Sequence, residues 1–337
     1  MVGAESNGTQ DLWDYVPDEL RVRYDELLVS IPHAARVAAQ SFPDFEAIVD
    51  DGVRLTFAEL EDAMLDAVRG MIAMGIRPGD RVAVWAPNCA QWILAALGIQ
   101  GAGGVLVPLN TRFKGEEAAY VLNKSGATAL VVANGFLGTD YVQMLREADP
   151  DLAVLRPGRV VIVNGVAREG EVAWDDFISA GQVVSRDEAT ASIDAVGSDT
   201  VSDIMFTSGT TGHPKGVMLT HGQSLRAHGW LSKVMDFRAG DRYLIIPPFF
   251  HTFGYKSGWM ACIVHGVTIL PEPVFSVPKV LKVIDEQKIS ILEGPPTLFQ
   301  GILDAPDRDA YDLSSIASHH GLCCRRAPEL IARMRDG

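Results

Sequence analysis

Hydrophobic residues follow two different patterns along the chain. Short runs of Val, Ile, Leu and Ala alternate with longer stretches in which hydrophobic residues recur every three to four positions. The short runs predict buried strands, and the periodic stretches predict helices that cover them. The predicted strands are Ala47–Val49, Val82–Trp85, Gly104–Pro108, Ala129–Ala133, Val160–Val163, Asp203–Thr207, Tyr243–Ile246, Val267–Leu270 and Ser290–Leu292. Such alternation predicts an α/β fold with a mostly parallel sheet between helices.

Local signals place several helices and one long connection. The predicted helices are Phe57–Ala73, Cys89–Ile99, Glu116–Asn123, Ser224–Val234 and Pro278–Asp285. Thr56 and Glu59 form a capping-box pattern for the first helix, and Asn88 is the predicted N-cap of the second. The segment Gln182–Thr200 is polar and rich in small residues, which predicts a surface connection.

One apolar stretch, Trp92–Leu109, is long enough to raise the question of a membrane span. No charged residue lies between Arg81 and Arg112. The stretch contains Gln100, a run of small residues and Pro108, so a helix, a tight turn and a buried strand explain it better than a bilayer span.

The composition excludes some classes of protein. The chain has 337 residues, 47% of them hydrophobic and 21% charged, which is typical of a globular protein with a core of its own. A net charge of −14 with no basic stripe argues against nucleic-acid binding. The start of the chain lacks the apolar region of a signal peptide, and the cysteines form neither a metal-binding pair nor a disulfide framework. These features favour a cytoplasmic protein, with peripheral contact to a membrane kept as an alternative.

The segment FTSGTTGHPKGV, Phe206–Val217, has the chemistry of a phosphate-binding loop. Its glycines let successive backbone N–H groups point to one place, its hydroxyl groups add donors, and its lysine adds a positive charge. The candidate residues for binding ATP phosphates are Thr207, Ser208, Gly209, Thr210, Thr211, Gly212, Lys215 and Gly216. A surface loop that merely joins a strand to a helix is the alternative.

Two better-known phosphate-binding motifs do not fit the chain. A Walker A loop that starts at Gly209 would need glycine at Pro214 and Ser or Thr at Gly216. A dinucleotide-binding fingerprint that starts at Gly101 would need glycine at Leu106.

Other candidate residues are ambiguous without further information. His251 lies among aromatic residues, where a histidine is more often a hydrogen-bonded core residue than a catalyst. The segment GPPTLFQ, residues 294–300, can form a pocket wall or a simple turn between a strand and a helix. Lys256 and His221 are interpreted as exposed polar residues with no role, and Trp85, Trp92 and Trp230 as core residues.

The segment TSGTTGHPKG resembles the phosphate-binding signature of the adenylate-forming superfamily, which includes acyl-CoA synthetases, luciferases and peptide-synthetase adenylation domains. The segments GAGGVLVPLNTRF, PPFFHTFGY and EGPPTLFQ resemble later landmarks of acyl-CoA synthetases, in the same order. The resemblance extends from about Ile31 to the C-terminus. It implies the N-terminal domain of such an enzyme, with two mostly parallel, helix-flanked sheets.

The resemblance also implies an activity. Members of this branch join a carboxylic acid to CoA through an acyl-adenylate, with ATP, Mg²⁺ and CoA. It implies that His251 orients or gates the acyl site, and it places these residues around the acyl and CoA pocket: Phe250, His251, Phe253, Gly254, Tyr255, Gly294, Pro295 and Thr297. No acidic residue lies between Leu244 and Trp259, which favours a fatty, aryl or alicyclic acid over an amino acid.

The resemblance predicts an incomplete enzyme. It implies an extension over residues 1–27 and an AMP-binding domain over residues 28–337, with subdomains at about 55–235 and at 28–54 plus 236–337. The family's Mg-binding glutamate, β-barrel and C-terminal domain with its lysine are not found in the sequence, so no catalytic or metal-binding residue is assigned. We therefore expect a truncated form that is inactive alone, whose uncovered surface favours a homo-oligomer or dependence on a partner. A non-catalytic nucleotide- or acyl-binding remnant and a relative with another acceptor are the alternatives.

The segment Ala317–Ala327, ASHHGLCCRRA, departs from the family pattern. Adjacent histidines and adjacent cysteines have the wrong spacing for a zinc site. A local frameshift pair is a second hypothesis, because codons that can encode HHGLCC, shifted by one nucleotide, encode a Thr-Gly turn like that of the family.

Overall fold

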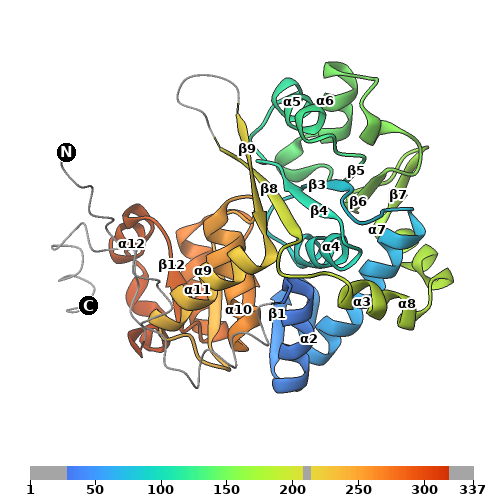
Figure 1. The fold of residues 1–337 in the computed structure, drawn as a ribbon. Helices are drawn as coiled ribbons and strands as arrows, with labels where there is room; N and C mark the ends of the chain where they lie inside the picture. Colours follow the sequence, from blue (N-terminus) through green and yellow to red (C-terminus); the bar gives the residue numbers. More distant parts are fainter. Residues whose placement is uncertain (1–28, 208–213, 319–337) are drawn as a thin grey trace, which may run out of the picture.

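The structure is a computed structural model that describes residues 29–207 and 214–318 (Figure 1). Two sheets with helices on their faces lie beside each other, and the β8–β9 hairpin lies where they meet. One sheet has seven strands in the order β7-β6-β5-β3-β4-β8-β9, and the other has five in the order β12-β10-β11-β1-β2. The predicted α/β fold with two mostly parallel, helix-flanked sheets is confirmed. The predicted extension over residues 1–27 and nearly all of Ala317–Ala327 lie outside the described residues.

The seven-stranded sheet is parallel except for its last strand, β9, which is antiparallel to β8. Alternate residues of a strand point to opposite faces, so the sheet has a buried core on each side. Val82 and Val84 of β3 face one core, while Ala83 and Trp85 face the other. The strands are β3 (Arg81–Trp85), β4 (Val105–Pro108), β5 (Ala129–Ala133), β6 (Val160–Asn164), β7 (Glu171–Ala173), β8 (Val201–Thr207) and β9 (Lys215–Thr220).

Two groups of helices cover the faces of this sheet. The first core includes residues of α3 (Phe57–Ala73), α4 (Ala90–Gly101), α7 (Trp174–Ala180) and α8 (Arg186–Asp194). The second includes residues of α5 (Gly115–Ser125) and α6 (Tyr141–Ala148). A strand with a core on both sides reads as a continuous hydrophobic run, which is why the sequence identified β3, β5 and β6 directly.

The five-stranded sheet is parallel except for the hairpin of β1 and β2. Its strands are β1 (Glu46–Asp50), β2 (Val53–Thr56), β10 (Arg242–Ile245), β11 (Thr268–Pro271) and β12 (Ile291–Glu293). Its helical elements are α2 (Ile31–Ser41), α9 (His221–Val234), the π-helical segment η5 (Phe253–Met260), α10 (Ala261–His265), α11 (Val277–Gln287) and α12 (Pro296–Leu303). Leu244, Leu270 and Leu292 pack against α11 and α12, while Tyr243 and Ile245 face the core shared with η5 and α10.

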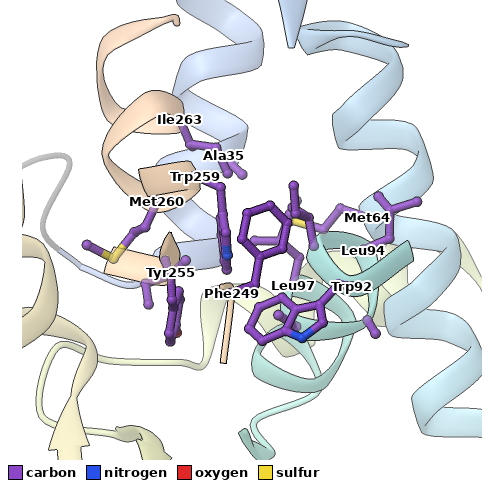
Figure 2. Packing of buried hydrophobic residues seen from close by; sticks show 14 of the residues in the cluster. Ala35, Met64, Trp92, Leu94, Leu97, Phe249, Tyr255, Trp259, Met260 and Ile263 are labelled. Atoms are coloured by element: carbon purple, nitrogen blue, oxygen red, sulfur yellow. The ribbon is translucent and has the colours of Figure 1, made fainter. Parts of the chain in front are cut away.

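A cluster of aromatic rings joins the two halves of the molecule (Figure 2). Trp92 of α4 makes edge-to-face contacts with Phe249, Tyr255 and Trp259, at ring-centroid distances of 5.5, 5.8 and 6.0 Å. Tyr255 also stacks on Trp259 at 4.9 Å. Since α4 packs on the seven-stranded sheet and η5 on the five-stranded sheet, the core continues from one half into the other.

Several sequence predictions are confirmed, and others are corrected. Helix α3 has the predicted bounds, and Thr56 and Glu59 form the predicted capping box. Trp92–Leu109 is most of a helix, followed by a turn and a buried strand. No helix in the described part of the chain is long and apolar enough to cross a membrane. Trp230 is not a core residue, because it is 39% exposed. Asn88 is not the N-cap of α4, because Cys89 takes that position and Asp50 accepts the hydrogen bond of Ala90 N–H.

The predicted surface connection Gln182–Thr200 contains the helix α8. The Ser185 side chain caps this helix by accepting a hydrogen bond from Glu188 N–H. Ala189 and Ile193 are fully buried against the neighbouring helices. Only two residues of this short helix are buried. Its hydrophobic periodicity is therefore too weak to be recognised in the sequence.

Candidate functional site

The candidate loops lie at the carboxyl ends of parallel strands. In open α/β sheets these ends are the usual place for ligands. β10 leads into Pro247–Thr252, and β12 leads into Gly294 and the residues after it. Ile245 and Glu293, the last residues of these strands, pair with each other, so the two following segments are neighbours.

The candidate phosphate loop connects β8 to β9 as a hairpin. Thr207 pairs with Lys215, and Phe206 pairs with Gly216. Thr207 and Lys215 therefore face each other at the mouth of the loop, and Lys215 is exposed there. The loop does not lead directly into a helix, because β9 intervenes before α9. The candidate residues Ser208, Gly209, Thr210, Thr211 and Gly212 lie outside the described residues.

Two contacts support the mouth of this loop. A Cβ atom on Gly216 would lie 2.8 Å from Cγ2 of Ile204, so only glycine lets the hairpin close here without displacing that side chain. The hydroxyl of Tyr120, on α5, donates a hydrogen bond to the carbonyl of Pro214 at 3.3 Å. The C-terminal end of the loop is thus held in place by β8 and α5.

The segment after β10 turns sharply into η5. A Cβ atom on Gly254 would lie 2.2 Å from the carbonyl oxygen of Pro247 and 2.4 Å from that of Pro248, so this turn requires glycine. His251 is exposed, and its Nδ1 accepts a hydrogen bond from Phe253 N–H at 3.3 Å. His251 is therefore not a core histidine, and a neutral ring with this bond carries its proton on Nε2.

The remaining candidate pocket residues differ in exposure. Phe250 and Phe253 are half-buried, and Gly254, Tyr255 and Gly294 are buried, while Pro295 and Thr297 are exposed. Tyr255 is fully buried, and its hydroxyl accepts a hydrogen bond from Gln100 Nε2 at 2.6 Å. Its ring belongs to the aromatic cluster of Figure 2, so Tyr255 holds the start of η5 against the core.

Asn88 holds the turn after β10, a role that its sequence position did not reveal. Its side-chain amide donates to the carbonyls of Ile245 and Pro247, both at 3.0 Å, and its Oδ1 accepts from Phe249 N–H at 2.8 Å. The side chain is 4% exposed. The only sequence signal for this role is a lone polar residue shortly after a buried parallel strand. That signal is ambiguous, because the same position also suits a helix cap.

Lys256 and His221 were predicted to be exposed, and both are fully buried. Lys256 Nζ donates to Asp203 Oδ1 at 2.9 Å and to Ser224 Oγ at 2.8 Å. Burial raises the pKa of Asp203 and lowers that of Lys256, and each charge opposes the shift of the other. His221 accepts a hydrogen bond from Ile31 N–H at its Nδ1, and burial together with the charge of Lys256 lowers its pKa to about 3.

Within residues 29–207 and 214–318, no three His, Cys, Asp or Glu side chains converge where they could hold a metal ion.

The family model described as AMP-binding enzyme matches residues 35–332. The chain belongs to this family. It is 46% identical over 287 residues to a 3-[(3aS,4S,7aS)-7a-methyl-1,5-dioxo-octahydro-1H-inden-4-yl]propanoyl:CoA ligase of Rhodococcus jostii, a match that covers 85% of this chain and 56% of the relative. It is 33% identical over 317 residues to the mitochondrial medium-chain acyl-CoA ligase ACSF2 of Mus musculus, with 87% and 51% covered. The chain thus spans about half the length of the curated relatives it matches.

Solved structures with the same fold are also found. The N-terminal domain of FACL13 from Mycobacterium tuberculosis superposes with a TM-score of 0.71 at 27% identity, covering 85% of this chain and 68% of that one. The anthranilate CoA ligase AuaEII, in complex with anthranoyl-AMP, superposes with a TM-score of 0.75, covering 85% and 53%. Its identity of 22% shows a shared fold alone.

Proposed function

We propose that this chain is the nucleotide- and acyl-binding part of an ATP-dependent ligase that joins an alicyclic or fatty acid to CoA. The observation that carries the proposal is the β8–β9 hairpin, which presents Thr207 and Lys215 at the mouth of a glycine- and hydroxyl-rich loop. The AMP-binding family and the CoA ligases among its relatives support the same activity. The proposed division is a domain of residues 28–337 with subdomains at about 55–235 and at 28–54 plus 236–337.

The proposed reaction has two steps. A carboxylate oxygen of the acid attacks the α-phosphorus of ATP, the bond to pyrophosphate breaks, and an acyl-adenylate forms. The sulfur of CoA then attacks the acyl carbon, its proton is lost, and AMP leaves. Lys215 and the N–H and hydroxyl groups of the loop would bind the phosphates and stabilise the negative charge that develops on them. Mg²⁺ is part of the proposal at the level of the family, and no residue of this chain is assigned to it.

The pocket segment supports an acid without an amino group. Between Leu244 and Trp259 the chain has no carboxylate that could pair with an ammonium group. His251 is exposed, and because its Nδ1 accepts the hydrogen bond of Phe253 N–H, its Nε2 is the ring nitrogen that can donate to a carboxylate oxygen. The named substrate of the Rhodococcus relative is an alicyclic propanoyl group, which makes this class the first to test.

The test is a calorimetric titration of the chain with ATP, together with the variant Lys215→Ala. A charge-assisted hydrogen bond contributes about 1.5–3 kcal/mol, so we expect ATP to bind roughly tenfold to a hundredfold more weakly to the variant. The matched control is Lys282→Ala on α11, an exposed lysine in a 3.7 Å ion pair with Glu286, which is expected to leave ATP binding unchanged. Equal affinities of Lys215→Ala and the unaltered chain would contradict the assignment of the loop.

A further inference from the structure

A buried ion pair joins the strand of the phosphate loop to the segment of the proposed acyl pocket. Asp203 lies on β8, and Lys256 lies on η5. Their side chains are both 0% exposed, and Lys256 Nζ lies 2.9 Å from Asp203 Oδ1. Taking two charges out of water is costly, and a well-packed apolar pair in such a place is often as stable. A gain in stability is therefore a weak explanation for this pair.

The pair lies in a network of hydrogen bonds that joins three elements. Ser202 Oγ donates a hydrogen bond to Asp203 Oδ2 at 2.7 Å. Gln100 Nε2, on α4, donates to the Tyr255 hydroxyl and to the carbonyl of Ser202. Directional bonds of this kind fix the relative positions of β8, α4 and η5 more strictly than apolar contacts do.

The other ionisable groups near Lys256 are neutral. His221 and His228 both lie on α9, and burial lowers their pKa values to about 3 and about 4, with the charge of Lys256 adding to each shift. His228 Nδ1 lies 2.9 Å from Ser257 Oγ. Among the described residues, Asp203 is thus the carboxylate that balances the charge of Lys256 at this junction.

Lys256 forms hydrogen bonds with residues that lie before and after the hairpin loop in the chain. Asp203 precedes Thr207 on β8, and Ser224 stands on α9, which directly follows β9. One ammonium group therefore bonds to the strand that enters the phosphate hairpin and to the helix that follows the hairpin. The same lysine follows His251 and Gly254 in the chain, on the turn that leads away from the proposed acyl pocket.

We propose that Lys256 and Asp203 are positioning residues, whose ion pair aligns the phosphate hairpin with the acyl segment so that one ligand can occupy both. The inference rests on the proposed function. A small misplacement of bound groups removes much of the benefit of holding them together. Loss of the pair is therefore expected to affect a ligand that bridges the two subsites far more than a ligand that occupies one.

The experiment compares two ligands and one paired variant. AMP occupies the nucleotide subsite alone, whereas the 3-cyclohexylpropanoyl sulfamate of adenosine is a non-reactive copy of an alicyclic acyl-adenylate and bridges both subsites. The double variant Asp203→Val/Lys256→Met removes both charges and leaves neither one buried alone, so it is expected to fold with a Tm close to that of the unaltered chain. We expect AMP to bind within about threefold of its original affinity, and the bridging ligand to bind at least tenfold more weakly.

A second buried ion pair serves as the control, and a less disruptive variant tests the same inference. The pair Arg146–Glu171 joins α6 to β7 at 3.0 Å with the Glu171 side chain fully buried, and Arg146→Met/Glu171→Val is expected to change neither affinity. If the double variant at Lys256 does not fold, Ser224→Ala removes one bond of 2.8 Å to Lys256 and keeps the ion pair. For Ser224→Ala we expect a loss of about threefold or more for the bridging ligand alone.

The outcomes separate this inference from the proposed function. If the unaltered chain binds neither AMP nor the bridging ligand, the proposed function fails, and the positioning role fails with it. If the unaltered chain binds both ligands and the tested variant binds both as well as before, the proposed function stands and the positioning role is refuted. Equal losses for both ligands would show a general structural role and would also overturn the inference.

Discussion

The clearest pH-dependent prediction concerns Glu293, the last residue of β12. Its side chain is 2% exposed and accepts a hydrogen bond from the Tyr243 hydroxyl at 2.9 Å on Oε2. Its other oxygen, Oε1, is buried without a hydrogen-bond partner among the described residues. Burial raises the pKa of this carboxyl from 4.5 to about 7, with the Tyr243 bond opposing the shift. The folded state therefore retains a proton on Glu293 at pH values where the unfolded chain has lost it.

The direction of the stability change follows from this retained proton. Below pH 4.5 both states are protonated, and Glu293 adds no pH dependence. As the pH rises from 4.5 to about 7, the unfolded state is increasingly favoured, because it releases the proton more readily. The interval from 4.5 to about 7, at about 1.4 kcal/mol for each pH unit, gives a loss of about 3 kcal/mol in the free energy of unfolding. Above about pH 7 this contribution is constant.

The perturbation that isolates this effect is Glu293→Gln. Glutamine has nearly the shape of the protonated acid and does not titrate. The variant therefore does not lose free energy of unfolding through this residue as the pH rises above 4.5. The difference in unfolding free energy between the variant and the unaltered chain is therefore expected to shift in favour of the variant by about 2–3 kcal/mol between about pH 5 and about pH 8. Burying the new glutamine amide without a partner has a cost that does not depend on pH, so this cost cancels when the two pH values are compared.

Urea denaturation followed by tryptophan fluorescence, at both pH values, measures this shift. The control is Glu286→Gln, an exposed glutamate on α11 whose replacement changes the net charge by the same amount. A shift for Glu293→Gln no larger than that of the control would refute the argument. It would mean that the Glu293 carboxyl reaches water or a partner in the folded protein.

Two packing predictions follow from the junction of the two sheets. Gly254→Ala is expected to lower the free energy of unfolding by about 2 kcal/mol or more, because the new Cβ would lie 2.2 Å from the carbonyl of Pro247, whereas Gly197→Ala, where the nearest atom would lie 3.9 Å away, should cost far less. Trp92→Ala is expected to cost about 3–5 kcal/mol, because its ring is fully buried among three others, and Trp230→Ala, at a residue that is 39% exposed, should cost much less. Urea denaturation measures all four variants, and a Gly254→Ala or Trp92→Ala variant no less stable than its control would contradict the corresponding prediction.

The sequence predicted those parts of the fold that depend on local patterns. The continuous apolar runs of β3, β5 and β6 are buried on both faces, so their composition alone identified them as strands. Helix α3 was predicted with its bounds because its cap and its hydrophobic periodicity agree. In both cases the residues that give the signal lie within a few positions of one another in the chain.

The sequence failed where partners distant in the chain decide the structure. Strand β9 is mostly exposed, so no alternation marks it, and its pairing with β8 defines it. Lys256 resembles a surface residue until Asp203, more than fifty positions earlier, is placed beside it. Asn88 resembles a helix cap until the carbonyls after β10 reach its side chain. The phosphate loop remains a prediction from the chemistry of its residues and from the family resemblance, because no periodicity encodes such a loop.

The junction of the two sheets uses two kinds of contact, and they have different consequences. The rings of Trp92, Phe249 and Trp259 bury a large apolar area, which stabilises the junction but tolerates small shifts of one half against the other. The hydrogen bonds of Asn88 and the ion pair of Lys256 hold only if their atoms keep specific distances, so they fix the relative position of the two halves. Substitutions among the rings should therefore change mainly the free energy of unfolding. Substitutions of the buried polar groups, made without leaving a lone charge, should change mainly the affinity for a ligand that spans both halves.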